Sequence, residues 1–354
     1  MKTKIISCFT KPSAWFVSFF TLACICISAW PAHAAPRATL DAKSADPYLG
    51  AIVVDADTGQ ILFADNPDVK GYPASVLKLM DLLIILEKIN SGAMRLDEKI
   101  TISAEVSKIG GSQVYLKENE IFTVDELLYA LMIQSANDAA TALAIQAAGS
   151  KEGFVALMNQ KAKDLGLKST EFHSIHGLPP AKDQLPDITT TRDLARLARE
   201  LLKYPDSLRY TSTKEHGFRD NKFIMRNHNR LLASFPGCDG FKTGYFSKAG
   251  YSIVATAKRE NNRVIAVILG STLKKIRDNK AAELLAKGFT LMPQKPAFAP
   301  APPKAVEQPV VKKESRRGRA VWIVLSILSL AIIAGVCGWF FFYRPKNTDL
   351  LQRH

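Results

Sequence analysis

Hydrophobic patterns divide residues 47–290 into strands at both ends and helices between them. The segment 49–66, LGAIVVDADTGQILFADN, has two runs of apolar and β-branched residues that flank a D-T-G turn, which predicts a hairpin. Near the far end, GFKTG at 240–244 predicts a strand. The segment YSIVATAKRENNRVIAVILG at 251–270 predicts a second hairpin, which turns at 260–262.

Apolar positions at helical spacing fill the middle of this region. They predict helices over 75–92, 124–149, 154–166 and 191–204, and a closing helix over 277–289. The helical pattern in 124–149 continues on both sides of Ser135. Strands at both ends with helices between them indicate an α/β domain, in which an antiparallel sheet is closed by pairing of the first and last strands.

Two further apolar segments lie outside this domain. Residues 1–34 begin with lysines, continue with an apolar run and end in A-H-A, which predicts an export signal cleaved after Ala34. An uncleaved anchor is the alternative. Residues 320–343 are 24 residues without a charge. They would extend about 36 Å as a helix, which is enough to cross a bilayer, and a buried core helix is the alternative.

The remaining segments connect to the predicted membrane helix. Residues 292–319 are rich in proline and basic residues, which predicts an extended linker. If the signal directs export, the domain lies on the outer, periplasmic side of the bacterial cytoplasmic membrane, and the tail 344–354 lies inside. Lys and Arg residues at 312–319 then lie on the outer side, where they either bind anionic headgroups or wall polymers or are simply solvated.

Composition refines this organisation. The chain has 354 residues, of which 47% are hydrophobic and 23% charged, which excludes a disordered or collagen-like protein. The net charge of +14 first suggests a polyanionic partner. Residues 35–291 carry only +4 of it, however, so we expect no nucleic-acid partner. Cys238 is the single cysteine in that region, which excludes a disulfide within it.

The first candidate for chemistry is S-V-L-K, with Ser75 and Lys78. A nucleophilic serine needs a base within reach, and positions i and i+3 share one face of a helix. Lys78 must be neutral to accept a proton, so we expect burial and neighbouring positive charge to lower its pKa. Pro73 predicts a helix start, which would place the Ser75 N–H where an oxyanion can bind. Taken alone, the motif also fits a helix cap and a surface lysine.

Two further motifs carry polar residues in apolar surroundings. Ser135 could relay a proton, and Asn137 could hydrogen-bond a substrate amide; a helix-junction cap is the alternative. In the predicted strand, Lys242 supplies positive charge, Thr243 can donate to a carboxylate, and Gly244 leaves room for an extended peptide. The alternative there is an ordinary edge strand whose lysine deters aggregation.

The order and spacing of the three motifs resemble those of the penicillin-binding proteins and β-lactamases. The chain resembles in particular the low-molecular-mass penicillin-binding proteins, which are serine D-alanyl-D-alanine carboxypeptidases. The resemblance covers about residues 47–290 and includes PASVLKLM, GGSQVYLKENE, LLYALMIQSANDAA and DGFKTGY. It implies a transpeptidase-like fold, an antiparallel sheet flanked by helices, to which the sequence adds one C-terminal transmembrane helix.

The resemblance also implies roles for matching residues. Ser75 would be the acylated nucleophile, Lys78 its general base, and Ser135 with Asn137 the second catalytic element. The terminal carboxylate would be bound by Lys242, Thr243 and Arg277. The backbone N–H groups of Ser75 and Tyr245, beside Gly244, would form the oxyanion hole. The reaction would release D-Ala from peptidoglycan stem peptides without a metal or cofactor, and β-lactams would acylate the same serine.

This sequence departs from the family pattern at two positions and leaves alternatives open. Phe246 replaces the usual Thr, and His173 replaces a common Asn. A metal site at His173 and His176 is not favoured, because no other cluster of ligands accompanies them. A β-lactamase would need a deacylating Glu, which the segment 181–203 lacks in the expected form. An endopeptidase that cuts cross-links remains an alternative, as does a non-catalytic scaffold.

Overall fold

The computed structural model of the chain describes residues 47–292, 325–330 and 332–335. The chain divides into two units, residues 1–293 and 294–354. The predicted export signal (1–34), the tail (344–354) and almost all of the linker (292–319) lie outside the described residues. The first unit contains the predicted α/β domain.

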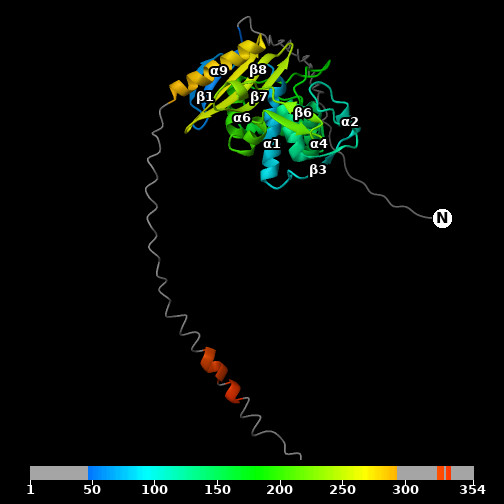
Figure 1. Cartoon of the computed structure of the whole chain (residues 1–354), viewed down its shortest axis with the longest axis vertical. Coiled ribbons are helices and arrows are strands. Elements are labelled where there is room, and N and C mark those ends of the chain that lie inside the picture. The colour runs from blue at the N-terminus through cyan, green and yellow to red at the C-terminus, as the bar shows by residue number, and fades with distance from the viewer. Residues whose placement is uncertain (1–46, 293–324, 331, 336–354) are drawn as a thin grey trace, which may run out of the picture. The chain divides into compact units, whose positions relative to one another are not determined.

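A five-stranded antiparallel sheet forms the centre of this domain (Figure 1). Its strands are β1 (Gly50–Asp55), β2 (Ile61–Asp65), β7 (Cys238–Phe246), β8 (Gly250–Arg259) and β9 (Asn262–Ser271). The order across the sheet is β2-β1-β9-β8-β7, with β1 antiparallel to β9. The predicted pairing of the first and last strands is therefore confirmed. Strand β7, which carries the K-T-G motif, lies at one edge.

Both faces of the sheet are buried, which explains why its strands read as nearly continuous apolar runs. Successive side chains point to opposite faces. In β1, Ile52 and Val54 join the large core formed with the helices, whereas Ala51 and Val53 join a second core. The second core also contains residues of the C-terminal helix α9 (Lys274–Leu291). This helix extends beyond the predicted range of 277–289 in both directions.

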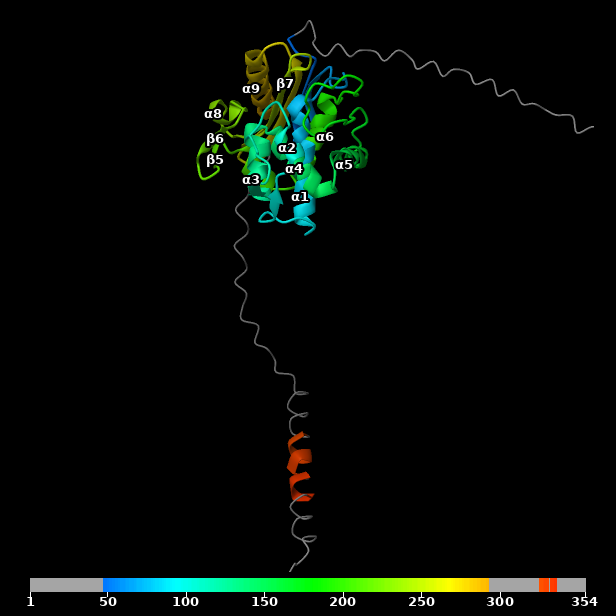
Figure 2. The same ribbon diagram turned by 90° about the vertical axis from the view of Figure 1, so that its right-hand side faces the viewer.

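Helix α9 covers one face of the sheet, and most of the other helices lie on the opposite face (Figures 1 and 2). The largest of these are α1 (Lys78–Asn90), α4 (Asn137–Ala148), α5 (Lys151–Asp164) and α6 (Thr191–Leu201). Shorter helices are α2 (Ala104–Ser107), α3 (Val124–Tyr129), α7 (Asp206–Thr211) and α8 (Leu231–Ser234). Every residue of α1 from Lys78 to Leu86 is buried, so this helix passes through the core.

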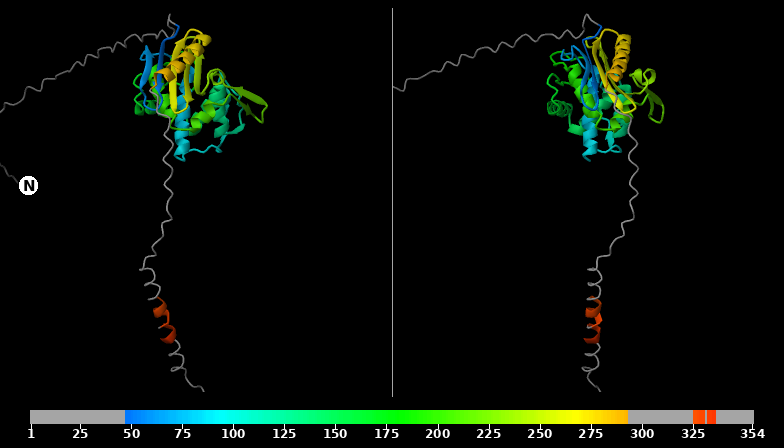
Figure 3. Two further views of the ribbon diagram at one scale, coloured as in Figure 1. Left: turned by 60° about the vertical axis from the view of Figure 1, so that its left-hand side comes forward. Right: turned by 90° about the vertical axis from the view of Figure 1, so that its left-hand side faces the viewer.

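Two small hairpins and two irregular turns complete the domain. The pairs are β3 (Lys99–Thr101) with β4 (Ile121–Thr123), and β5 (Glu215–Phe218) with β6 (Phe223–Arg226). The β5–β6 pair projects from the side of the domain (Figures 2 and 3). A 3-10 turn, η1 (Ala74–Leu77), precedes α1, and a π-helical turn, η2 (Ala130–Gln134), follows α3. The predicted helix over 75–92 thus begins as a 3-10 turn that contains Ser75, and the predicted helix over 124–149 is interrupted at Ser135.

The second unit is described at residues 325–330 and 332–335, which are helical. Among the described residues, no helix combines the length and apolar character that crossing a membrane requires. The predicted membrane helix at 320–343 lies mostly outside them.

Candidate active site

Ser75 and Lys78 meet where the 3-10 turn η1 joins α1. Ser75 is the second residue of η1, directly after Pro73 and Ala74, and it is partly buried. Ala74 has a φ of 47°, a left-handed conformation that is unfavourable for a residue with a side chain. The side chains share one face, and Lys78 Nζ donates to Ser75 Oγ at 3.3 Å. The predicted i, i+3 contact is confirmed.

Lys78 is held by two further hydrogen bonds. Its Nζ donates to Asn137 Oδ1 at 2.8 Å and to the backbone carbonyl of His176 at 2.7 Å. The side chain is fully buried, and burial lowers the pKa of Lys78 to about 8. A substantial fraction of Lys78 is therefore neutral near physiological pH. These contacts use all three donor directions of the ammonium group and fix it beside Ser75.

The charges around Lys78 are mixed. The predicted positive neighbour is present, because Lys78 and Lys242 repel one another and this repulsion lowers the pKa of Lys242. Acids that the sequence did not reveal also act on Lys78. Asp81, Asp187 and Asp138 each raise the pKa of Lys78, and burial outweighs them. The nearby acids come from one helical turn further along α1, from the segment before α6, and from α4.

Ser135 and Asn137 lie at the junction of η2 and α4. Ser135 ends the π-helical turn with a left-handed backbone, φ 61° and ψ 31°, and its side chain is buried. Its Oγ has no hydrogen-bond partner among the described residues. Asn137 binds Lys78 through Oδ1 and donates from Nδ2 to the Gly110 carbonyl at 2.8 Å. Its amide is thus engaged within the protein, whereas the sequence suggested a contact with substrate.

The third motif lies on the edge strand β7 and packs against η1. Lys242 and Thr243 are buried. A Cβ on Gly244 would lie 2.6 Å from the Pro73 carbonyl oxygen and 3.1 Å from the Ser75 nitrogen, so only glycine allows this approach. The adjacent residue, Tyr245, stacks on Tyr251 with ring centroids 4.1 Å apart. The structure therefore places the backbone of β7 directly beside the nucleophile.

Positive charge gathers at this end of the site. Burial lowers the pKa of Lys242 well below its ordinary value, and the cations Lys78 and Arg277 lower it further. Arg277, on the first turns of α9, is also buried and binds Asp278 through two hydrogen bonds of 2.9 and 2.6 Å. His228 responds to the same cations, and burial together with Lys242 lowers its pKa to about 4. An anionic group of a substrate would offset this repulsion.

Known proteins are similar to this chain in sequence. The family model for D-alanyl-D-alanine carboxypeptidase matches residues 33–272. The chain is 36% identical over 279 residues to D-alanyl-D-alanine carboxypeptidase DacF of Bacillus subtilis. The aligned region covers 78% of this chain and 69% of that protein. The chain belongs to the D-alanyl-D-alanine carboxypeptidase family. The resemblance noted from the motifs is therefore confirmed.

Solved structures of this family and of penicillin-binding proteins share the fold. The D-alanyl-D-alanine carboxypeptidase DacD of Francisella tularensis superposes with a TM-score of 0.65 at 29% identity, over 71% of this chain and 72% of that one. Penicillin-Binding Protein D2 of Listeria monocytogenes, solved in its ampicillin-bound form, gives a TM-score of 0.63 at 31% identity, over 69% and 97%. The predicted fold of an antiparallel sheet flanked by helices is confirmed.

Phe246, which differs from the usual family residue, packs beside the site. Its ring lies 5.7 Å from that of Tyr72, and both pack with Ala74 and Ala249. Phe246 therefore lies against the strained turn that precedes the nucleophile. His173 is not part of this aromatic cluster. Its ring pairs with Glu171 at 3.0 Å, and its backbone N–H donates to Asp187.

The sequence did not reveal three residues around the site. Asp187 accepts hydrogen bonds from the backbone of His173 and from Ser174, and it acts on the charge of Lys78. Asp81 is buried, and neither carboxyl oxygen has a partner among the described residues. His228 lies near Lys242 only because the chain folds back. The sequence offered a signal for only one of these three residues, which is the acid Asp81 inside the apolar run LKLMDLLII.

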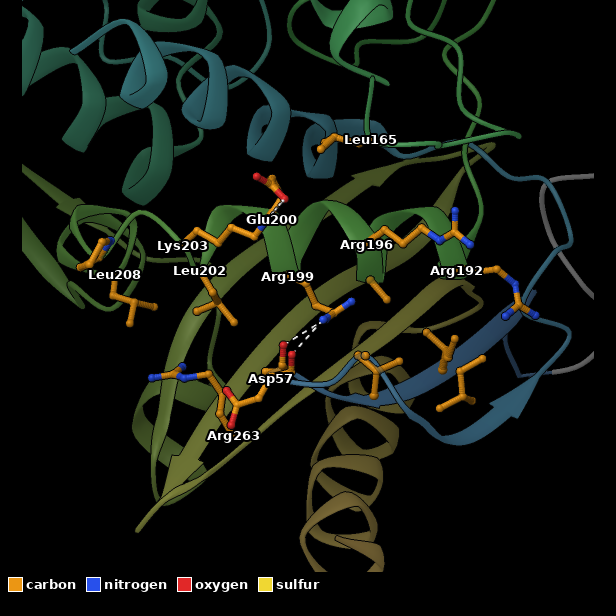
Figure 4. A pocket seen from close by; sticks show the side chains of 17 residues that line it. Asp57, Leu165, Arg192, Arg196, Arg199, Glu200, Leu202, Lys203, Leu208 and Arg263 are labelled. Atoms are coloured by element: carbon orange, nitrogen blue, oxygen red, sulfur yellow. Dashed lines mark hydrogen bonds and ion pairs between the residues drawn. The ribbon is translucent and has the colours of Figure 1, made fainter. Parts of the chain in front are cut away.

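A separate cavity of about 750 Å³ contains none of the predicted site residues. It lies between α6 and the β1–β2 turn, and its lining includes Arg192, Arg196 and Arg199 of α6 and Lys203 just after that helix (Figure 4). Arg199 donates to the carbonyl oxygens of Ala56 and Asp57, which ties the turn to the helix. No nucleophile with an adjacent base lines this cavity, so chemistry and not size identifies the active site.

Proposed function

We propose that this family member is a serine hydrolase that removes the terminal D-Ala from peptidoglycan stem peptides through an acyl-enzyme on Ser75. The contact between Lys78 Nζ and Ser75 Oγ, in a site where burial lowers the pKa of the lysine to about 8, carries the proposal. Neutral Lys78 takes the proton of Ser75 as its oxygen attacks the carbonyl carbon of the D-Ala-D-Ala bond. The backbone N–H groups of Ser75 and Tyr245 stabilise the oxyanion.

The remaining steps use the other motifs. Lys242, Thr243 and Arg277 bind the terminal carboxylate, which orients the peptide along β7 beside Gly244. The unpartnered hydroxyl of Ser135 passes a proton to the leaving amine, and Asn137 holds Lys78 in place. Water then hydrolyses the acyl-enzyme. No step requires a metal ion or a cofactor.

β-Lactams are proposed to acylate the same serine. The relative from Listeria monocytogenes, solved in an ampicillin-bound form, supports this, because its chain superposes on this one over the domain that holds Ser75. Export by residues 1–34 and anchoring in the cytoplasmic membrane through residues 320–343 are proposed from the sequence pattern. The catalytic domain, residues 47–290, would then act on the outer side, joined to the anchor by the linker 292–319.

The test uses the purified full-length chain in detergent. It measures labelling by a fluorescent penicillin and release of D-Ala from an acyl-D-Ala-D-Ala peptide. We expect both in the wild type, and neither in Ser75→Ala. Labelling that survives in Ser75→Ala would reject Ser75 as the nucleophile. Rapid turnover of penicillin without release of D-Ala would instead identify a β-lactamase. Labelling without turnover of penicillin and without release of D-Ala would indicate a non-catalytic scaffold.

A further inference from the structure

A second cavity, of about 440 Å³, is lined in part by sequence neighbours of the candidate site residues. Its lining includes Gln134, Ile224, His228, Arg230 and Lys274. These residues come from the end of η2, the β5–β6 hairpin, the loop that follows it, and the start of α9. None of them belongs to the motifs discussed above.

The cavity lies on the side of the site where the released residue is bound. Gln134 directly precedes Ser135. Lys274 precedes Arg277 by one helical turn of α9, and His228 responds to the charges of both Lys242 and Arg277. The residues that line the cavity are therefore sequence neighbours of Ser135 and Arg277 or interact electrostatically with Lys242.

The charges in the cavity favour an anion. Arg226 on its rim pairs with Glu215 at 3.0 Å, whereas Arg230 and Lys274 form no salt bridge within the part of the chain described. The pKa of Lys274 is lowered, first by burial and then by Arg230 and Arg277, as expected for cations that repel one another. Phe223 and Ile224 provide an apolar wall beside them.

The methyl group of a released D-Ala would leave almost all of this space empty. Cavities of a few hundred Å³ with one apolar wall and a few convergent polar groups are typical ligand sites. The combination here fits an aliphatic chain that ends in an anionic group.

We propose that this cavity is a leaving-group subsite, which binds an anionic side chain on the D-amino acid that the enzyme releases. The inference rests on the proposed function, because it assigns the carboxylate of that amino acid to Lys242 and Arg277. The enzyme then accepts leaving groups larger than D-Ala.

The test compares four substrates that differ only in the residue released: acyl-D-Ala followed by D-Ala, D-Glu, D-Gln or D-Lys. D-Gln has nearly the shape of D-Glu without its charge, so the ratio of kcat/KM for D-Glu to that for D-Gln isolates the charge. With the full-length chain in detergent, we expect a ratio of about five, because charge-assisted hydrogen bonds to partly exposed cations contribute modestly. We expect D-Lys to be the poorest of the four.

Two variants test the assigned residues. Arg230→Ala and Lys274→Ala should each bring the ratio close to one. Lys275→Ala is the matched control, since it removes a lysine at the next position of α9, which is exposed and does not line the cavity. The ratio in this control should stay at the wild-type value.

The outcomes separate this inference from the proposed function. Release of D-Ala with a wild-type ratio near one, or a ratio that Arg230→Ala and Lys274→Ala leave unchanged, would overturn the subsite. Failure to release any amino acid would overturn the proposed function itself. A ratio that falls equally in Lys275→Ala would also overturn the subsite, because it would reflect the general charge of α9.

Discussion

Lys78 shows how burial alone can create a base. Three acids near it raise its pKa, yet the loss of water around a fully buried ammonium group outweighs them. When Lys78 is neutral, two N–H groups can still donate to Asn137 and to the His176 carbonyl, which leaves the lone pair for the hydroxyl of Ser75. Burial therefore tunes this residue, and the polar contacts position it.

This balance predicts the pH dependence of acylation. Lys78 must be neutral to act, and its pKa is lowered to about 8. We expect kcat/KM for D-Ala release to rise roughly tenfold per pH unit well below that value and to level off above it. The measurement is kcat/KM from about pH 6 to about pH 9.5. A profile that levels off already below pH 7 would contradict Lys78 as the base. Lys78→Arg, which stays protonated, should show no such rise.

Asp81 predicts a different pH effect, on stability. Burial raises the pKa of Asp81 well above its ordinary value. The proton on its carboxyl therefore favours the folded state at acidic pH, and this contribution is lost as the pH rises from about 4 through the raised pKa. Asp81→Asn cannot ionise. We expect its Tm, relative to wild type, to be higher by about 3 °C at neutral pH than at pH 4.

Thermal unfolding of both proteins at a series of pH values checks this prediction. Parallel curves for wild type and Asp81→Asn would show that Asp81 keeps the same protonation in the folded and unfolded states. Asp97→Asn is a suitable control, because Asp97 lies at the surface in a pair with Arg95.

At the scale of elements, the site depends on irregular turns at which helices are interrupted. The turn η1 places Ser75 before α1, and η2 ends in the left-handed Ser135 before α4. Strand β7 reaches the first turn only because Gly244 has no side chain. Regular helices through both serines would point their hydroxyls elsewhere, so these breaks place the hydroxyls in the site.

The junction at Ser135 allows its backbone and its hydroxyl to be separated. We expect Ser135→Ala and Ser135→Gly both to lose most D-Ala release, because both lack the hydroxyl. Glycine adopts the left-handed conformation without strain, so Ser135→Gly should be more stable than Ser135→Ala by about 1 kcal/mol. Denaturant unfolding measures the difference. Equal stability of the two variants would argue that the left-handed turn relaxes when serine is replaced.

At the scale of the whole molecule, charge and chemistry are separated along the chain. Residues 35–291 carry +4 of the net charge of +14, and the remainder lies in the two ends. Inside the domain, a few buried cations form the site, while the basic linker and apolar segment follow it. Most of the high net charge therefore lies outside the domain that holds the candidate site.

The proposed anchor gives a test at this scale. We expect the full-length chain, expressed in a bacterium, to sediment with membranes, and a chain ending at residue 319 to remain in the soluble fraction of the cell envelope. Labelling by fluorescent penicillin follows both proteins. A full-length chain that is labelled but soluble would reject the anchor at residues 320–343, without affecting the assignment of Ser75.

The sequence by itself determined the order of the central strands and the longer helices, the three motifs, and the family, but it did not predict the two small hairpins or the short helices α2, α7 and α8. The predicted features depend on local periodicity and on residue types at fixed spacing, which a linear chain displays directly. It also identified Ser75 with Lys78, because three residues along a helix already bring side chains together.

Only the tertiary structure decided what surrounds that pair. The acids that act on Lys78, the Gly244 contact with η1, and the cations around His228 join residues that lie far apart in sequence. The acids near Lys78 were not predicted for the same reason. Burial and long-range charge depend on how elements pack, and no local pattern records that packing.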